Sequence, residues 1–196
     1  MFTKKLSLNN IDTKEWFSYF RKYRVKAGIL LSLGCFYFAE PVFYSFLAGI
    51  PLLIIGEIIR IWASGHIVKS SSLTVSGPYS FARHPLYIGS LLIGIGFVLI
   101  CRSIIVIIIF LTYFILFYPA TIISEESLLG EKFKDSFKIY RQAVSAFFRK
   151  KESWYLPGRY APFKFTRFIH NKEYKLVILL IIVLALLYIK MKLPAA

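Results

Sequence analysis

Long, nearly uninterrupted apolar blocks are the feature of this sequence that most restricts its fold. They fill roughly residues 25–39, 42–63, 85–101 and 103–123, and a shorter block covers 176–189. The blocks do not show the 3.6-residue rhythm of a soluble helix, and long apolar runs are typical of membrane-spanning helices. A hydrophobic content of 57% agrees, because soluble domains are about 45–50% apolar. We therefore predict an all-α integral membrane protein with about five transmembrane helices.

The blocks divide the chain into four parts. Residues 1–24 mix aromatic and basic side chains and are predicted to form an amphipathic segment in the membrane interface. A four-helix membrane core at 25–123 follows, and then a polar, basic region at 124–175. We expect a fifth membrane helix at 176–190. Because this last block is short, a hairpin arm or an interfacial helix is the alternative.

The net charge of +15 is distributed beside the apolar blocks. The turns at 40–41 and 102–103 hold a single basic residue, Arg102, whereas the other connections hold nearly all Lys and Arg. The positive-inside rule therefore places these other connections in the cytoplasm. Basic residues in such positions favour membrane lipids as partners and argue against nucleic acid.

The connection before the third block ends in GPYSFARHPLY, residues 77–87. Gly77-Pro78 is typical of a turn, and Pro85 is typical of a first helical position. Arg83 and His84 would then lie at a helix N-terminus, where backbone N–H groups and the helix dipole favour a carboxylate or phosphate. The alternative is that Arg83 reaches lipid headgroups while His84 caps the helix.

Two adjacent carboxylates, Glu125 and Glu126, follow the fourth block. At the C-terminal end of a helix they would oppose the dipole and need a compensating positive charge. Arg83, at the same end of the neighbouring span, is the expected partner. The alternative is a purely structural ion pair that joins spans three and four.

Other polar and aromatic residues gather near this side of the membrane. Phe133, Phe137 and Tyr140 form a row at helical spacing, which favours anchoring in the interface. His66 and Lys69, at the end of the second span, could share a helix face and bind an anion or meet headgroups.

Several familiar sites are absent from the sequence. It contains no Walker loop and no complete dinucleotide-binding fingerprint. His66, His84 and His170 lack the spacing of zinc ligands. Cys35 and Cys101 fall in apolar blocks, so we predict core residues, with no disulfide framework and no metal site.

Three features in this order resemble the isoprenylcysteine carboxyl methyltransferase family. They are the GPYSFARHPLY stretch, the two spans after it, and EESLL with Phe133 and Tyr140 following. The superfamily of this family also includes phospholipid methyltransferases. The resemblance covers roughly residues 57–148 and implies a membrane methyltransferase that uses S-adenosyl-L-methionine. The implied pocket faces the cytoplasm of a bacterial or archaeal cell and is formed by the interhelix loop and the C-terminal region. Its implied cofactor-binding residues are Tyr79, Arg83, His84, Pro85, Tyr87, Glu125, Glu126 and His66, of which Glu125, Glu126 and Arg83 are also the implied catalytic residues.

These residue types suit the implied cofactor. Arg83 and His84 suit its carboxylate, and Glu125 or Glu126 its ammonium or a ribose hydroxyl. Tyrosine faces can lie near a sulfonium, as they do near other cations. The acceptor would be hydrophobic or lipidic, with a carboxylate, thiol or amine, and would enter between helices.

One position departs from the family pattern. Many members carry an Arg about four residues before the Glu pair, where this chain has Thr121. His66, Lys69 or Arg141 are candidate substitutes.

Two other functions remain open. Membrane sterol reductases share a related helical architecture and use NADPH, and a non-enzymatic lipid-binding protein would use its basic face only to hold headgroups. The Glu pair after a helical hairpin favours the methyltransferase.

Overall fold

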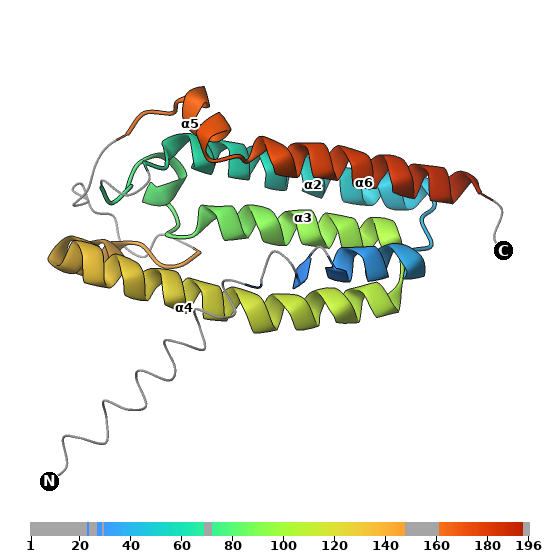
Figure 1. Ribbon diagram of the computed structural model, residues 1–196, viewed down its shortest axis with the longest axis horizontal. Helices are drawn as coiled ribbons and strands as arrows, with labels where there is room; N and C mark the ends of the chain where they lie inside the picture. Colours follow the sequence, from blue (N-terminus) through green and yellow to red (C-terminus); the bar gives the residue numbers. More distant parts are fainter. Residues whose placement is uncertain (1–22, 24–26, 29, 69–71, 148–160, 194–196) are drawn as a thin grey trace, which may run out of the picture.

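The computed structural model describes residues 23, 27–28, 30–68, 72–147 and 161–193. The regular elements in these ranges are helices (Figure 1), which confirms the predicted all-α class. The predicted interfacial segment at 1–24 lies outside them apart from Tyr23.

Four long helices run side by side along the molecule (Figure 1): α2 at Phe43–His66, α3 at Pro85–Cys101, α4 at Ile104–Ala143 and α6 at Tyr174–Lys192. A helical segment also covers residues 30–38. Of the described helices, α2, α4 and α6 are long and apolar enough to cross a membrane, and α3 is a shorter apolar helix. Helices suit lipid because they satisfy their own backbone hydrogen bonds.

Short elements close one end of the bundle. These are a 3₁₀ turn at Gly77–Ser80 and helix α5 at Phe165–His170. Gly77 has φ 59°, a left-handed conformation that favours glycine, and it lies against the ring of His66. The predicted Gly-Pro turn is confirmed.

Helix α4 differs from the prediction, because it does not end near residue 123. It continues to Ala143 with a kink at Lys134, so Glu125 and Glu126 lie in its middle. The end of an apolar pattern does not by itself end a helix, and the Glu, Leu and Lys residues that follow residue 123 favour a helical conformation. The 40 residues span about 60 Å, twice the ~30 Å of a bilayer's hydrocarbon core, so the part after 123 extends beyond it. The prediction that Glu125 and Glu126 lie at the C-terminal end of a helix was therefore wrong.

Helices α2 and α3 approach each other closely at glycines. A Cβ on Gly56 would lie 2.6 Å from the carbonyl oxygen of Gly89, and one on Gly96 would lie 2.7 Å from that of Gly49. Small residues allow this approach, which is typical of membrane helix pairs.

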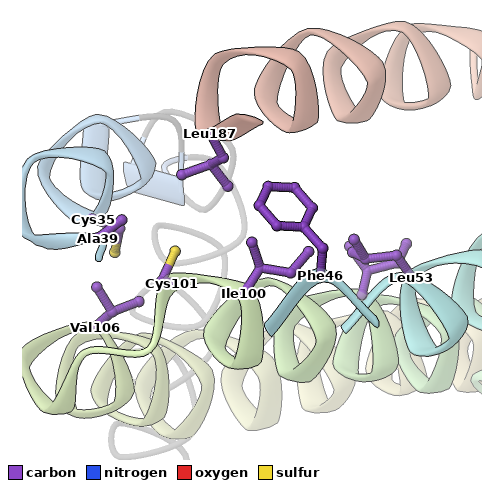
Figure 2. Packing of buried hydrophobic residues seen from close by; sticks show 9 residues of the cluster. Cys35, Ala39, Phe46, Leu53, Ile100, Cys101, Val106 and Leu187 are labelled. Atoms are coloured by element: carbon purple, nitrogen blue, oxygen red, sulfur yellow. The ribbon is translucent and has the colours of Figure 1, made fainter. Parts of the chain in front are cut away.

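The end of the bundle farther from the 3₁₀ turn holds the apolar core (Figure 2), built from Cys35, Ala39, Phe46, Leu53, Ile93, Ile100, Cys101, Val106 and Leu187. Both cysteines are buried there as free thiols, as predicted. The Lys190 Nζ donates to the carbonyl oxygens of Phe36 and Tyr37 at 2.7 and 2.8 Å, which ties the segment at 30–38 to α6. This packing leaves the opposite end of the bundle to form a polar site.

Candidate functional site

A cavity of about 420 Å³ lies where the end of α2, the 3₁₀ turn, the start of α3, the middle of α4 and the start of α6 meet. Its volume is within the ~300–1,000 Å³ of small-molecule sites. We call it the polar cavity. Six predicted site residues line it, namely Tyr79, Arg83, His84, Pro85, Tyr87 and Glu125. Arg60, Leu129, Lys132, Phe133, Tyr140 and Glu173 are also in its wall.

Arg83 is held from several sides. Its Nε and Nη2 donate to Glu126 Oε1 at 2.9 and 2.6 Å, and its Nη1 donates to the carbonyl oxygens of Arg141 and Val144. The Arg83 side chain is only 9% exposed, so it does not extend toward lipid headgroups. The predicted compensation by Arg83 is confirmed for Glu126, and this ion pair joins the loop before α3 to α4.

The backbone of the motif is attached to the end of α4. The Arg83 N–H donates to the Ser145 carbonyl oxygen at 2.9 Å, and the His84 N–H donates to that of Ala146 at 3.1 Å. The loop that precedes α3 is thus held in place by main-chain contacts as well as by charge.

His84 is buried against two neighbours. Its Nε2 lies 3.2 Å from Glu126 Oε1, and its ring stacks on Tyr87 with centroids 5.5 Å apart. His84 is the N-cap residue of α3, but its side chain makes no capping hydrogen bond, so that alternative was wrong. The Tyr87 hydroxyl donates to Glu125 Oε1 at 2.5 Å.

The two adjacent glutamates differ in environment. The Glu126 side chain is 12% exposed, whereas that of Glu125 is 39% exposed and lines the polar cavity. Burial alone raises the pKa of Glu126, but hydrogen bonds from His84 and Arg83 and their positive charge outweigh it and lower the pKa from 4.5 to about 2. Glu126 is therefore a charged structural anchor, and Glu125 is the carboxylate that faces the cavity.

Two residues of the aromatic row on α4 are buried rather than interfacial, and the third, Phe133, is partly buried against them. Phe137 and Tyr140 are 4% and 2% exposed and pack with Leu73 and Val75. The Tyr140 hydroxyl donates to the Tyr79 carbonyl oxygen at 2.6 Å, and burial raises the Tyr140 pKa above its ordinary value. The predicted interfacial anchoring was wrong, because long-range packing covers this face of α4.

Two of the predicted site residues do not line the polar cavity. Glu126 lies behind Arg83, and His66 is buried with its Nδ1 2.7 Å from the Ala161 carbonyl oxygen and 3.3 Å from the Ser76 hydroxyl. His66 thus ties the end of α2 to the segment before α5. Lys69 falls outside the described residues.

The position at which many family members carry an arginine, residue 121 here, is buried and does not face either cavity. Thr121 is fully buried, and its hydroxyl donates to the Phe117 carbonyl oxygen at 2.6 Å. Arg141, a candidate substitute, is largely exposed, and its Nε lies 3.5 Å from Glu126 Oε2.

Sequence reasoning missed a second ion pair at the cavity, between Arg60 of α2 and Glu173 at the start of α6. The Arg60 Nη2 lies 2.5 Å from Glu173 Oε2, and its Nη1 donates to the Ser90 hydroxyl at 2.5 Å. A single arginine inside an apolar span was the available signal, because charges in membrane helices usually mark functional positions.

A second, mostly apolar cavity of about 330 Å³ lies between α3, α4, α6 and the segment at 30–38. We call it the apolar crevice. Phe97, Phe110, Tyr113 and Leu180 are among its lining residues, and Arg60 lies at its polar end. A mostly apolar lining favours a hydrocarbon chain over a polar ligand.

In the described ranges, no three His, Cys, Asp or Glu side chains gather as a metal site would require.

The fold and the polar cavity together define an all-α membrane protein with a ligand-sized polar site at one end of its bundle. The phospholipid methyltransferase family model matches residues 44–136, which include nearly all of α2, all of α3 and both glutamates. This match supports the predicted resemblance of the chain to the isoprenylcysteine/phospholipid methyltransferase superfamily of membrane proteins.

Two curated relatives are each 36% identical to the chain. The nickel-cobalt-cadmium resistance protein NccN of Alcaligenes xylosoxydans xylosoxydans aligns over 115 residues, or 55% of this chain and 52% of the relative. The cobalt-zinc-cadmium resistance protein CzcN of Cupriavidus metallidurans aligns over 102 residues, or 51% and 45%. The chain thus spans about half the length of these relatives. No solved structure matches it at a significant level.

Proposed function

We propose that this protein is an S-adenosyl-L-methionine-dependent methyltransferase that modifies a hydrophobic or lipid acceptor within the membrane. The observation that carries the proposal is the arrangement of two cavities: a polar one with an accessible carboxylate and aromatic walls, and an apolar one that meets it at Arg60. The match to the phospholipid methyltransferase family model supports the reaction class.

The residues of the polar cavity fit this cofactor. Glu125 keeps part of its carboxylate exposed and suits the ammonium group or a ribose hydroxyl. Tyr79 and Tyr87 offer rings near a sulfonium, and the N-terminus of α3 suits a carboxylate. The bound cofactor would supply an electrophilic methyl group, and the chain would orient it and exclude water.

Arg83 and Glu126 are assigned a different role from the one implied by family resemblance. Because the Arg83 guanidinium already donates to Glu126 and to two carbonyl oxygens, little of it remains for a ligand. We assign both as positioning residues that hold His84 and the loop before α3 in place. Glu125 is the residue of this group that contacts the cofactor.

The acceptor would occupy the apolar crevice. Its tail would lie among aromatic and aliphatic side chains of α3, α4 and α6, and its reactive group would point toward Arg60 and the polar cavity. Entry from the side suits a molecule that is already dissolved in the bilayer.

The test is calorimetric titration of detergent-purified protein with S-adenosylhomocysteine and, separately, with NADPH. Wild type is compared with Glu125→Gln, which keeps the shape of the side chain, and with Glu40→Gln, an exposed carboxylate far from the cavity. We expect micromolar binding of the adenosyl ligand, weakened about tenfold or more in Glu125→Gln through loss of a charge-assisted hydrogen bond. Glu40→Gln should bind as wild type does.

Two other outcomes would contradict the proposal. NADPH binding without adenosyl binding would support the reductase. If folded wild-type protein binds neither nucleotide, the methyltransferase proposal fails and the lipid-binding function remains.

A further inference from the structure

Arg60 occupies a singular place between the two cavities. Of the described residues, it alone lines both the polar cavity and the apolar crevice. Its Nη2 donates to Glu173 on the polar side, and its Nη1 donates to Ser90 on the crevice side. The stem of the side chain crosses α3 at Gly89, where an added Cβ would lie 2.6 Å from Arg60 Cγ. The guanidinium therefore stands as a partition between the cavities.

Methyl transfer between the cavities requires that this partition move. The donor and acceptor atoms must come into contact, since the displacement is in line and needs close approach. With Arg60 bound to both Glu173 and Ser90, its side chain separates the two spaces. A second carboxylate within reach of the Arg60 guanidinium would let it move and still be paired with a negative charge.

Glu57 provides that second place. It is 91% buried in the membrane helix α2, and within the described part of the chain neither of its carboxylate oxygens has a hydrogen-bond partner. The Nε of Arg60 is likewise buried and unpaired. A buried carboxylate without a partner is costly and tends to mark a functional position in a membrane helix.

The spacing allows the two unpaired groups to meet. Glu57 and Arg60 are three residues apart on one helix, so their side chains are neighbours on its surface. Helical side chains also lean toward the N-terminus, which directs Arg60 toward Glu57. A change of Arg60 rotamer is the motion that would exchange one carboxylate for the other.

We propose that Arg60 is a gate between the polar cavity and the apolar crevice, and that it opens by moving from Glu173 and Ser90 to Glu57. This inference rests on the proposed function, in which donor and acceptor occupy the two cavities. The guanidinium is paired with a carboxylate in both positions, so the exchange costs little charge separation. The open position joins the two spaces and frees Glu173 at the mouth of the polar cavity.

The gate is tested by chemical access to the crevice, which needs no turnover. The full chain, with Cys35→Ala and Cys101→Ala to remove its own thiols and Ile93→Cys in the crevice wall, is placed in nanodiscs. A membrane-impermeant cationic thiosulfonate is excluded from the bilayer, so we expect it to reach the new thiol through the polar cavity. The labelling rate measures how often the gate is open.

Loss of each carboxylate should change this rate in opposite directions. Glu173→Gln should label about tenfold faster and Glu57→Gln about tenfold slower, as expected for one charge-assisted hydrogen bond. In an Arg60→Ala background, Glu57→Gln should have no further effect. Glu40→Gln is the matched control and should not change the rate.

Equal rates in Glu57→Gln and its parent, with circular dichroism showing both folded, overturn the gate. An effect of Glu57→Gln that persists without Arg60 overturns it as well. Binding of S-adenosylhomocysteine, measured on the same samples, separates the two proposals. A protein that binds it but shows no carboxylate-dependent labelling keeps the proposed function and loses the gate.

Discussion

Replacing Glu126 with glutamine should destabilise the protein by about 3 kcal/mol, because Glu126 is the counter-charge of a buried guanidinium. A fall in pKa from 4.5 to about 2 corresponds to roughly 3 kcal/mol, at about 1.4 kcal/mol per pH unit. An independent figure agrees, since removing one partner of a buried ion pair costs about 3–5 kcal/mol. The Arg83 side chain, 9% exposed, would remain charged and lose its carboxylate.

The two buried cysteines make the assay simple. A dye that fluoresces on reaction with thiols reports unfolding, because Cys35 and Cys101 are 5% and 0% exposed in the folded chain. At ~2–4 °C per kcal/mol, Glu126→Gln should melt roughly 6–12 °C below wild type. Asp135→Asn, an exposed carboxylate on the same helix, is the control and should melt near wild type.

The pH dependence provides a second check. The folded pKa of Glu126 is lower than the unfolded one, so its contribution is complete above pH 4.5 and is lost as pH falls toward 2. Melting followed by circular dichroism should therefore show a smaller gap between wild type and Glu126→Gln at pH 3 than at pH 7. A variant that melts within about 2 °C of wild type at pH 7 would refute the reasoning.

Three further substitutions test other parts of the structure in the same melting assay. Tyr140→Phe removes the hydroxyl that donates to the Tyr79 carbonyl oxygen and should lower the free energy of unfolding by about 1–2 kcal/mol. It should also weaken binding of S-adenosylhomocysteine. Unchanged stability would mean that the hydrogen bond is not formed. Gly96→Ala places a methyl 2.7 Å from a facing carbonyl oxygen and should destabilise the protein by about 1–3 kcal/mol. Gly34→Ala is its control, because nothing lies within 4 Å of the added methyl, and it should not destabilise the protein. Equal effects of the two substitutions would contradict the close approach of α2 and α3. Lys190→Met removes two hydrogen bonds to the segment at 30–38 and should cost about 1–3 kcal/mol, and a melting temperature equal to wild type would show that the segment is held otherwise.

Local signals predicted a large part of the fold. The third apolar block coincides with α3, because Pro85 begins a helix and Arg102, at φ 53°, ends it. The blocks at 42–63 and 176–189 correspond to α2 and α6, each slightly longer than predicted. These features depend on hydrophobicity and backbone propensity over a few turns, which sequence contains directly.

The site was predicted only in part. Arg83 was expected to compensate the adjacent Glu125 and Glu126, since opposite charges at one end of neighbouring spans attract each other. Which glutamate faces the cavity was not predictable, because adjacent helical positions differ by about 100° in direction and only packing decides which direction is buried. The direction of the His66 side chain was also not predictable from sequence. His66 was expected in the site and is instead buried beside it.

Sequence alone thus determined that this chain is a bundle of membrane helices with a charged motif at the start of the third. Only the tertiary structure decided that Glu126 anchors while Glu125 is exposed, and that Arg60 pairs with a residue 113 positions away. Hydrophobic pattern and helix propensity act between near neighbours and are readable along the chain. The choice of partner for a buried charge depends on which distant side chains packing brings within hydrogen-bonding distance.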